Sequence, residues 1–144
     1  MSTLSKGHFA AKHPPGTQVP ADLKQAVREK LMNGAISCQS AHGIAHTLRV
    51  PPIEVGVAID LAEGRILKCQ LGLFGYGKGK KKVKPAKSIM PDLRNAIESA
   101  LEKDHLPCTA AWHIAKDQAI PRRAVADACE MLGVRIKPCQ LGAF

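Results

Sequence analysis

Residues 41–59 read AHGIAHTLRVPPIEVGVAI, and residues 111–129 read AWHIAKDQAIPRRAVADAC. The two stretches align without a gap when the chain is shifted by 70 residues against itself. Each has apolar residues at helical spacing on both sides of a short break that ends in proline. Because proline is tolerated in the first turn of a helix, each stretch predicts a helix, a tight connection and a second helix that begins at Pro51 or Pro121.

The same alignment extends in both directions and pairs residues 22–74 with residues 92–144. About a third of the paired positions are identical and none needs an insertion, which indicates two copies of one supersecondary unit. The string Cys-Gln-Leu-Gly-x-Phe, at residues 69–74 and 139–144, is the end of each copy.

Each copy is expected to contain three helices and short extended pieces, so the predicted fold class is mainly α with short β. An amphipathic helix precedes the helix pair, and the stretches RILKCQL and RIKPCQL each predict a closing strand. A segment rich in Gly and Lys separates the copies and is expected to be solvated and mobile. The expected organisation is an N-terminal arm at 1–20, a first unit at 21–74, a basic linker at 75–89 and a second unit at 90–144.

The paired helices resemble the helix-turn-helix motif, and the extended residues before them with a strand after them resemble its winged-helix variety. Ala45 is the small residue that lets the two helices approach, and Ala115 takes its place in the second copy. The resemblance implies a tandem repeat of two winged-helix-like helix-turn-helix units. The chain departs from the family in the turn, where Arg49 and Ala119 stand in place of a frequent glycine, and in the second copy, where only one wing strand fits. The buried positions that carry the pattern are Ile44, Leu48, Val50, Val55 and Ala58, and Ile114, Ile120, Val125 and Ala128.

The positive charge of the chain is concentrated in one segment. The formal net charge is +9, and residues 76–87 hold six lysines and no acidic residue, which is typical of an arm that lies along nucleic-acid phosphates. The resemblance implies that the third helix of the second copy enters the major groove, where Arg122 and Arg123 could contact guanine or phosphate. We therefore expect a DNA-binding protein, a transcriptional regulator whose partner is duplex DNA. The candidate contact residues are Lys78, Lys80, Lys81, Lys82, Lys84, Arg122 and Arg123.

A protein-contact function is the alternative hypothesis. The outward face of the third helix in the first copy carries Ile53, Gly56, Val57 and Asp60, and none of these is a good reader of bases. Ile53 and Val57 would form an apolar stripe that suits a homodimer interface or another protein partner. The chain would then be an assembly module on the same fold.

The five cysteines, an odd number, argue against a closed disulfide framework and favour a reduced, cytoplasmic protein. The second copy has Trp112 and Lys116 where the first has two histidines that could bind metal, so the thiols are expected to pack as small buried hydrophobes without metal or cofactor. A thiol- or metal-responsive regulator is a third hypothesis. No arrangement of residues typical of catalysis stands out, so we do not expect an enzyme, and no apolar run is long enough to cross a membrane. The candidate Cys2His2 set of the first copy is Cys38, His42, His46 and Cys69.

Overall fold

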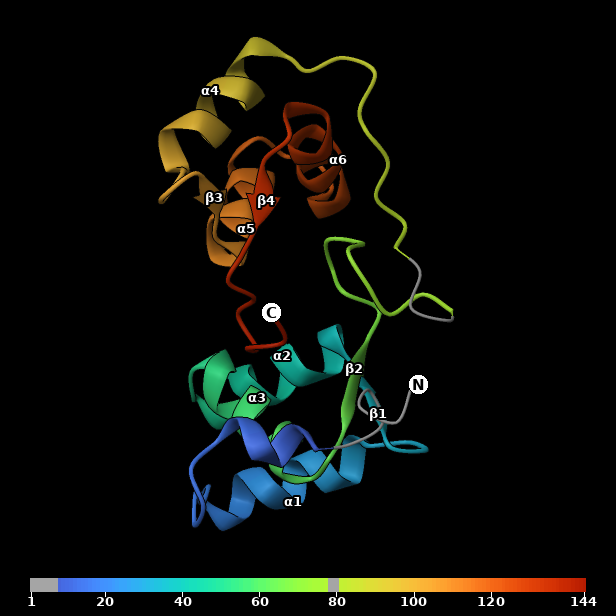
Figure 1. The fold of residues 1–144 in the computed structure, drawn as a ribbon, viewed down its shortest axis with the longest axis vertical. Coiled ribbons are helices and arrows are strands. Elements are labelled where there is room, and N and C mark those ends of the chain that lie inside the picture. The colour runs from blue at the N-terminus through green and yellow to red at the C-terminus, as the bar shows by residue number, and fades with distance from the viewer. Residues whose placement is uncertain (1–7, 78–80) are drawn as a thin grey trace. The chain divides into compact units, whose positions relative to one another are not determined.

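The computed structural model describes residues 8–77 and 81–144, and the fold in these ranges is mainly α, as predicted. The same order of elements occurs twice, at a spacing of 70 residues (Figure 1). None of the helices in the described ranges is long and apolar enough to span a membrane. The first set comprises η2 (Phe9–Lys12), α1 (Ala21–Lys30), β1 (Ala35–Ser37), α2 (Cys38–Leu48), α3 (Pro52–Leu61) and β2 (Arg65–Leu67). The second comprises α4 (Pro91–Ala100), β3 (His105–Leu106), α5 (Cys108–Asp117), α6 (Arg122–Leu132) and β4 (Arg135–Ile136).

The turn between the second and third helices has the same geometry in both copies. Arg49 has a φ of 56° and Ala119 a φ of 54°, so both adopt the left-handed conformation that favours glycine. Glycine is frequent at this position in the helix-turn-helix motif that the sequence resembles. The backbone N–H of the next residue donates a hydrogen bond to the preceding helix in each copy. Val50 N donates to Ala45 O at 3.1 Å, and Ile120 N donates to Ala115 O at 3.0 Å. These hydrogen bonds offset the cost of about 1 kcal/mol for each left-handed residue.

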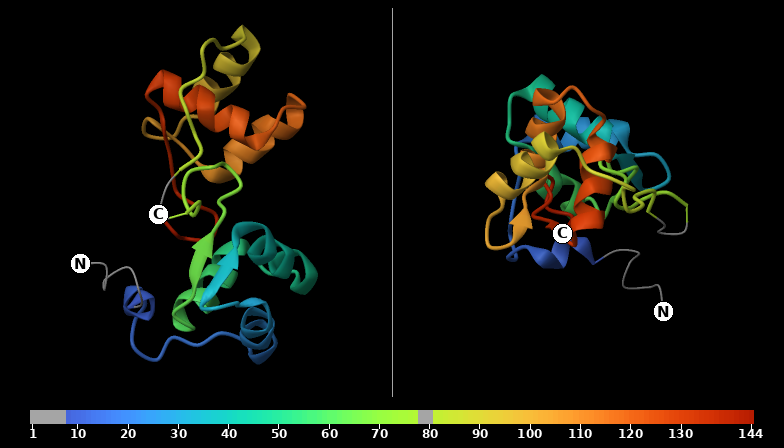
Figure 2. Two further views of the ribbon diagram at one scale, coloured as in Figure 1. Left: turned by 90° about the vertical axis from the view of Figure 1, so that its right-hand side faces the viewer. Right: turned by 90° about the horizontal axis from the view of Figure 1, so that it is seen from above.

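The strands of each copy pair in parallel, β1 with β2 and β3 with β4. Figure 2 shows β1 and β2 side by side. A wing would need two strands joined by a loop, and residues 8–77 and 81–144 form no such hairpin in either copy. The extended pieces that suggested the winged-helix variety are therefore a two-stranded parallel sheet, which α2 and α3 connect in one copy and α5 and α6 in the other.

The chain forms two compact units whose boundaries differ from the expected ones at the two Cys-Gln-Leu-Gly-x-Phe strings. Unit 1 contains the chain up to Lys68 together with Leu141–Ala143, and unit 2 contains Cys69–Gln140 together with Phe144. Each unit therefore holds part of the string that closes the other copy. We call this arrangement the exchange of the closing strings. It is explained by burial, because Leu71 is fully buried in the core of unit 2 and Leu141 is only 2% exposed in unit 1.

The segments that precede the first helix of each copy also belong to the units. In unit 1, Phe9 N and Ala10 N donate to the Glu63 carboxylate at 2.7 and 3.2 Å, which fixes η2 beside α3. In unit 2, Val83 is 4% exposed and its N–H donates to Gly72 O at 3.2 Å. The expected solvated, mobile linker is therefore docked from residue 81 onward, because one apolar side chain in the lysine run enters the core.

Candidate nucleic-acid interface

The described part of the lysine run, residues 81–87, is held along α6 by its backbone; we call it the lysine segment. Lys82 N donates to Gly72 O at 2.7 Å, and Lys84 N donates to Asp127 Oδ1 at 3.0 Å. Ala86 N donates to Asp127 O at 3.1 Å. Backbone anchoring leaves the lysine side chains available to solvent. The expected contact residues Lys78 and Lys80 lie outside the described residues.

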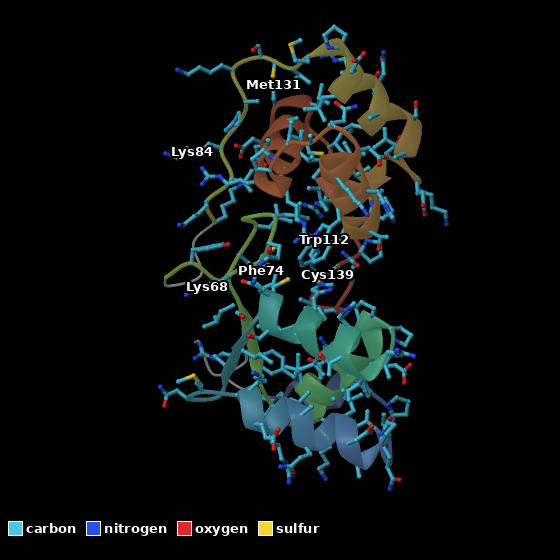
Figure 3. The ribbon with its side chains drawn as sticks, turned by 180° about the vertical axis from the view of Figure 1, so that it is seen from behind. Lys68, Phe74, Lys84, Trp112, Met131 and Cys139 are labelled. Atoms are coloured by element: carbon cyan, nitrogen blue, oxygen red, sulfur yellow. The ribbon has the colours of Figure 1, made fainter. Side chains whose placement is uncertain are left out.

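The lysine side chains of this segment are all exposed. Lys81 Nζ forms an ion pair with Glu130 Oε2 at 3.0 Å, and Lys82 Nζ lies 4.9 Å from the centroid of the Tyr76 ring. Figure 3 shows Lys84 projecting outward from its segment. The Glu130 carboxylate offsets the charge of Lys81, so the positive potential of the segment comes mainly from Lys82, Lys84 and Lys87.

Arg123 extends this positive surface onto the start of α6. Its Nε lies 3.9 Å from Asp127 Oδ2, and its side chain is 46% exposed. The aliphatic part of Arg123 packs beside Gly72, whose carbonyl accepts from the lysine segment. We define the basic face as Lys81, Lys82, Lys84, Lys87 and Arg123.

Arg122, the other expected base reader, is engaged within unit 2. Its guanidinium carbon lies 3.6 Å from the centroid of the Trp112 ring, and its Nη1 donates to Gln70 Oε1 at 3.1 Å. Gln70 of the closing string therefore accepts a hydrogen bond that orients Arg122, a role that the sequence did not indicate. Arg122 is therefore oriented by its own chain, whereas Arg123 remains exposed.

The outward face of α3 in unit 1 is partly covered by its own chain, although Ile53 stays 49% exposed. Gly56 packs against the backbone of Leu141, and the Ile53 side chain packs against Gly142. Asp60, 6% exposed, pairs with Lys12 Nζ at 3.0 Å and with His13 Nε2 at 2.9 Å. The expected apolar stripe of Ile53 and the half-buried Val57 thus lies on the helix that receives residues 141–143. The sequence held a weak signal of the contact with the N-terminal arm, since the 70-residue shift pairs Lys12 with Lys82.

The candidate metal set of the first copy is divided between the two units. Cys38 begins α2 in unit 1, whereas Cys69 packs in the core of unit 2, and His46 is exposed. Within residues 8–77 and 81–144, no three His, Cys, Asp or Glu side chains form a group that could hold a metal ion.

Three thiols gather in unit 2. Gln140 Nε2 donates to Cys108 Sγ at 3.4 Å, and Cys108 N donates to Pro138 O, so that Cys108 lies beside the strand end that carries Cys139. The two closing strings meet through Phe74 and Phe144, whose ring centroids are 5.7 Å apart. Burial raises the pKa values of Cys69 and Cys108, and the proximity of Cys139 raises both further. All five cysteines are buried and free of disulfides.

We expect these thiols to react slowly with alkylating agents in the folded protein. Burial raises the pKa of Cys129 to about 12 from an ordinary value of 9.0. At pH 8 its thiolate fraction, and so its alkylation rate, should be lower than in the unfolded chain by on the order of a thousandfold. Iodoacetamide labelling with and without denaturant, followed by peptide mass mapping, measures this ratio. Equal rates at Cys129 in the two states would contradict the buried placement.

No family model, no curated protein and no solved structure matches the chain.

Proposed function

We propose that the protein is a cytoplasmic regulator that binds duplex DNA, built on two tandem helix-turn-helix units, and that the basic face contacts the phosphates. The observation that carries this proposal is the docking of the lysine segment on α6 through Gly72 and Asp127. A docked segment presents its charges in fixed positions, so less conformational entropy is lost on binding than for a loose arm.

The basic face is suited to phosphate contacts more than to reading bases. Glu130 and Asp127 lie between its cations and would repel phosphates in a deep approach to the groove. Arg122 is oriented toward Trp112 and Gln70. Residues 9–13 and 141–143 occupy the outward face of α3 around Gly56 and Asp60, and Ile53, which stays 49% exposed there, offers no hydrogen-bonding group to a base. We therefore assign affinity to the lysine segment and Arg123, with little sequence preference.

A triple substitution tests the assignment. Replacing Lys82, Lys84 and Lys87 by alanine should weaken binding of a labelled duplex about ten- to hundredfold at low salt, equally for unrelated sequences. Fluorescence anisotropy at low ionic strength measures the dissociation constants.

The matched control for this experiment removes three positive charges from the exposed surface of α1 in unit 1, by replacing Lys24, Arg28 and Lys30 with alanine. This variant has the same net charge as the test variant. If both triple variants lose the same affinity, net charge alone would account for binding, and the basic face would not be the site.

Protein contact is the second candidate function, and the third helices favour it. In unit 1, α3 receives residues 9–13 and 141–143, and in unit 2, α6 contacts residues 72 and 81–86. A helix face that binds extended segments of its own chain is also suited to binding such a segment from a partner. Absence of duplex binding at low salt by the unmodified protein would discard the DNA proposal and favour this one.

A further inference from the structure

A cavity of about 330 Å³ opens in unit 2 between α5 and the start of α6. Its volume lies at the lower end of the range of ligand-binding pockets. The basic face does not line it, so it is a separate feature of the unit. The lining residues that matter here are Trp112, His113, Lys116, Ile120, Arg122 and Gln140.

The guanidinium of Arg122 is held in place at this cavity before any ligand arrives. It stacks 3.6 Å from the centroid of the Trp112 ring, and Nη1 donates to Gln70 Oε1 at 3.1 Å. A guanidinium has five N–H donors, so this single hydrogen bond leaves donors for a further acceptor. Fixed orientation reduces the entropy lost when an oxyanion is bound.

The charges around the cavity all have one sign. They are carried by Lys116 from α5 and Arg122 from α6, and within residues 8–77 and 81–144 no acidic residue lines the cavity. The large side chains of its wall are Ile120 and Trp112, and the uncharged polar residues Thr109 and Gln140 also line it. A ligand that matches this lining carries an oxyanion group on a small apolar body.

The first copy shows that the fold does not require these residues. The 70-residue shift pairs Trp112 with His42, Lys116 with His46 and Arg122 with Pro52. The buried residues beside them are shared, as in the pair Ile114 and Ile44, and so is the glutamine of the closing string. The cationic and aromatic residues are therefore particular to the second copy, and the first copy forms the corresponding helices without them.

We propose that this cavity binds a small organic anion, whose carboxylate or phosphate contacts Arg122 and Lys116 and whose apolar body lies against Trp112 and Ile120. The proposal does not rest on the DNA-binding function, because it uses residues outside the basic face.

Trp112 is the only tryptophan of the chain and lines the cavity, so its fluorescence reports binding directly. Titration with phenyl phosphate and with benzoate compares a phosphate with a carboxylate on the same apolar ring. Titration with inorganic phosphate measures binding of the oxyanion without the ring. We expect a saturable change with at least one of the aromatic anions, and binding of inorganic phosphate about ten times weaker. Lys116→Gln should weaken the aromatic anion about tenfold by removing one charged contact. Lys87→Gln, the same change in the lysine segment, should have no effect.

Three results would overturn the proposal. The first is the absence of a saturable Trp112 signal with all three compounds up to about 10 mM. The second is equal affinity of Lys116→Gln and Lys87→Gln for the aromatic anion. The third is a Trp112 response to duplex DNA but to none of the small anions, which would assign the cavity to a backbone phosphate. Loss of DNA binding in the lysine-segment variant has no bearing on these outcomes, so the two proposals fail separately.

Discussion

Replacing Gly56 by alanine is expected to destabilise unit 1 by about 2–3 kcal/mol. Gly56 is buried in α3, and an added Cβ would overlap the backbone carbonyl oxygen of Leu141. A backbone group cannot rotate away as a flexible side chain can, so residues 141–143 would have to leave the helix. Leu141, only 2% exposed, would then lose its burial. Urea unfolding followed by far-UV circular dichroism measures the change in the free energy of unfolding.

Gly43→Ala is the matched control for this substitution. Gly43 also lies inside a helix, α2, but it is exposed, and an added Cβ meets nothing within 4 Å. Since alanine favours a helix over glycine, this change should stabilise the protein by about 0.5–1 kcal/mol. The two glycine substitutions should therefore have opposite signs. A Gly56→Ala protein as stable as the unmodified chain would show that residues 141–143 do not lie on α3.

Leu71→Ala is expected to destabilise unit 2 by a similar amount, about 2–5 kcal/mol. Leu71 is fully buried in the core cluster of unit 2, together with Val83, Ile97 and Val125. Truncation removes the burial of its methyl groups and leaves a cavity that the surrounding helices can fill only in part. Because Trp112 packs against the same cluster, the unfolding transition followed by its fluorescence should shift to lower denaturant.

The neighbouring Leu73→Ala is the control for this experiment. Leu73 is only partly buried against the same cluster, so its truncation should cost less than that of Leu71. If Leu71→Ala leaves the Trp112 transition unchanged while the circular dichroism transition shifts, residue 71 would pack in unit 1, contrary to the structure.

The helix pair could be predicted from the sequence because its signals are local. The spacing of apolar residues around Pro51 and Pro121 predicted the helix on each side of both prolines. The 70-residue alignment paired these helices of the first copy with those of the second. The turn residues Arg49 and Ala119 weakened the resemblance to a known motif, yet both adopt the left-handed conformation that glycine would have supplied. Tertiary packing of the two helices therefore outweighs the local preference of these residues.

The exchange of the closing strings could not be predicted, and the repeat itself is the reason. Leu71 and Leu141 occupy the same position in two similar copies, so either side chain suits the core of either copy. Hydrophobic pattern cannot distinguish the two arrangements. The parallel pairing of the strands could not be predicted for a similar reason, since two short extended pieces can pair in parallel or in antiparallel order.

For the candidate site, the sequence named residues whose arrangement it could not predict. Lysine content and spacing marked residues 78–84 as a nucleic-acid contact, but the run contains a single apolar residue, Val83, whose burial docks the segment. Arg122 and Arg123 were indistinguishable in sequence. They differ in the structure because the guanidinium of Arg122 stacks on Trp112, whereas the side chain of Arg123 is 46% exposed.

The central claim, that the basic face binds DNA phosphates, is tested most directly by the salt dependence of binding. The measurement is the slope of the logarithm of the observed binding constant against the logarithm of the salt concentration, for the unmodified protein and for the Lys82, Lys84 and Lys87 triple alanine variant. Each phosphate contact contributes about 0.9 to the magnitude of this slope, so the triple variant should have a slope smaller by roughly 2–3. An identical slope in the two proteins would contradict the account, because it would show that the docked lysines release no counterions from the DNA.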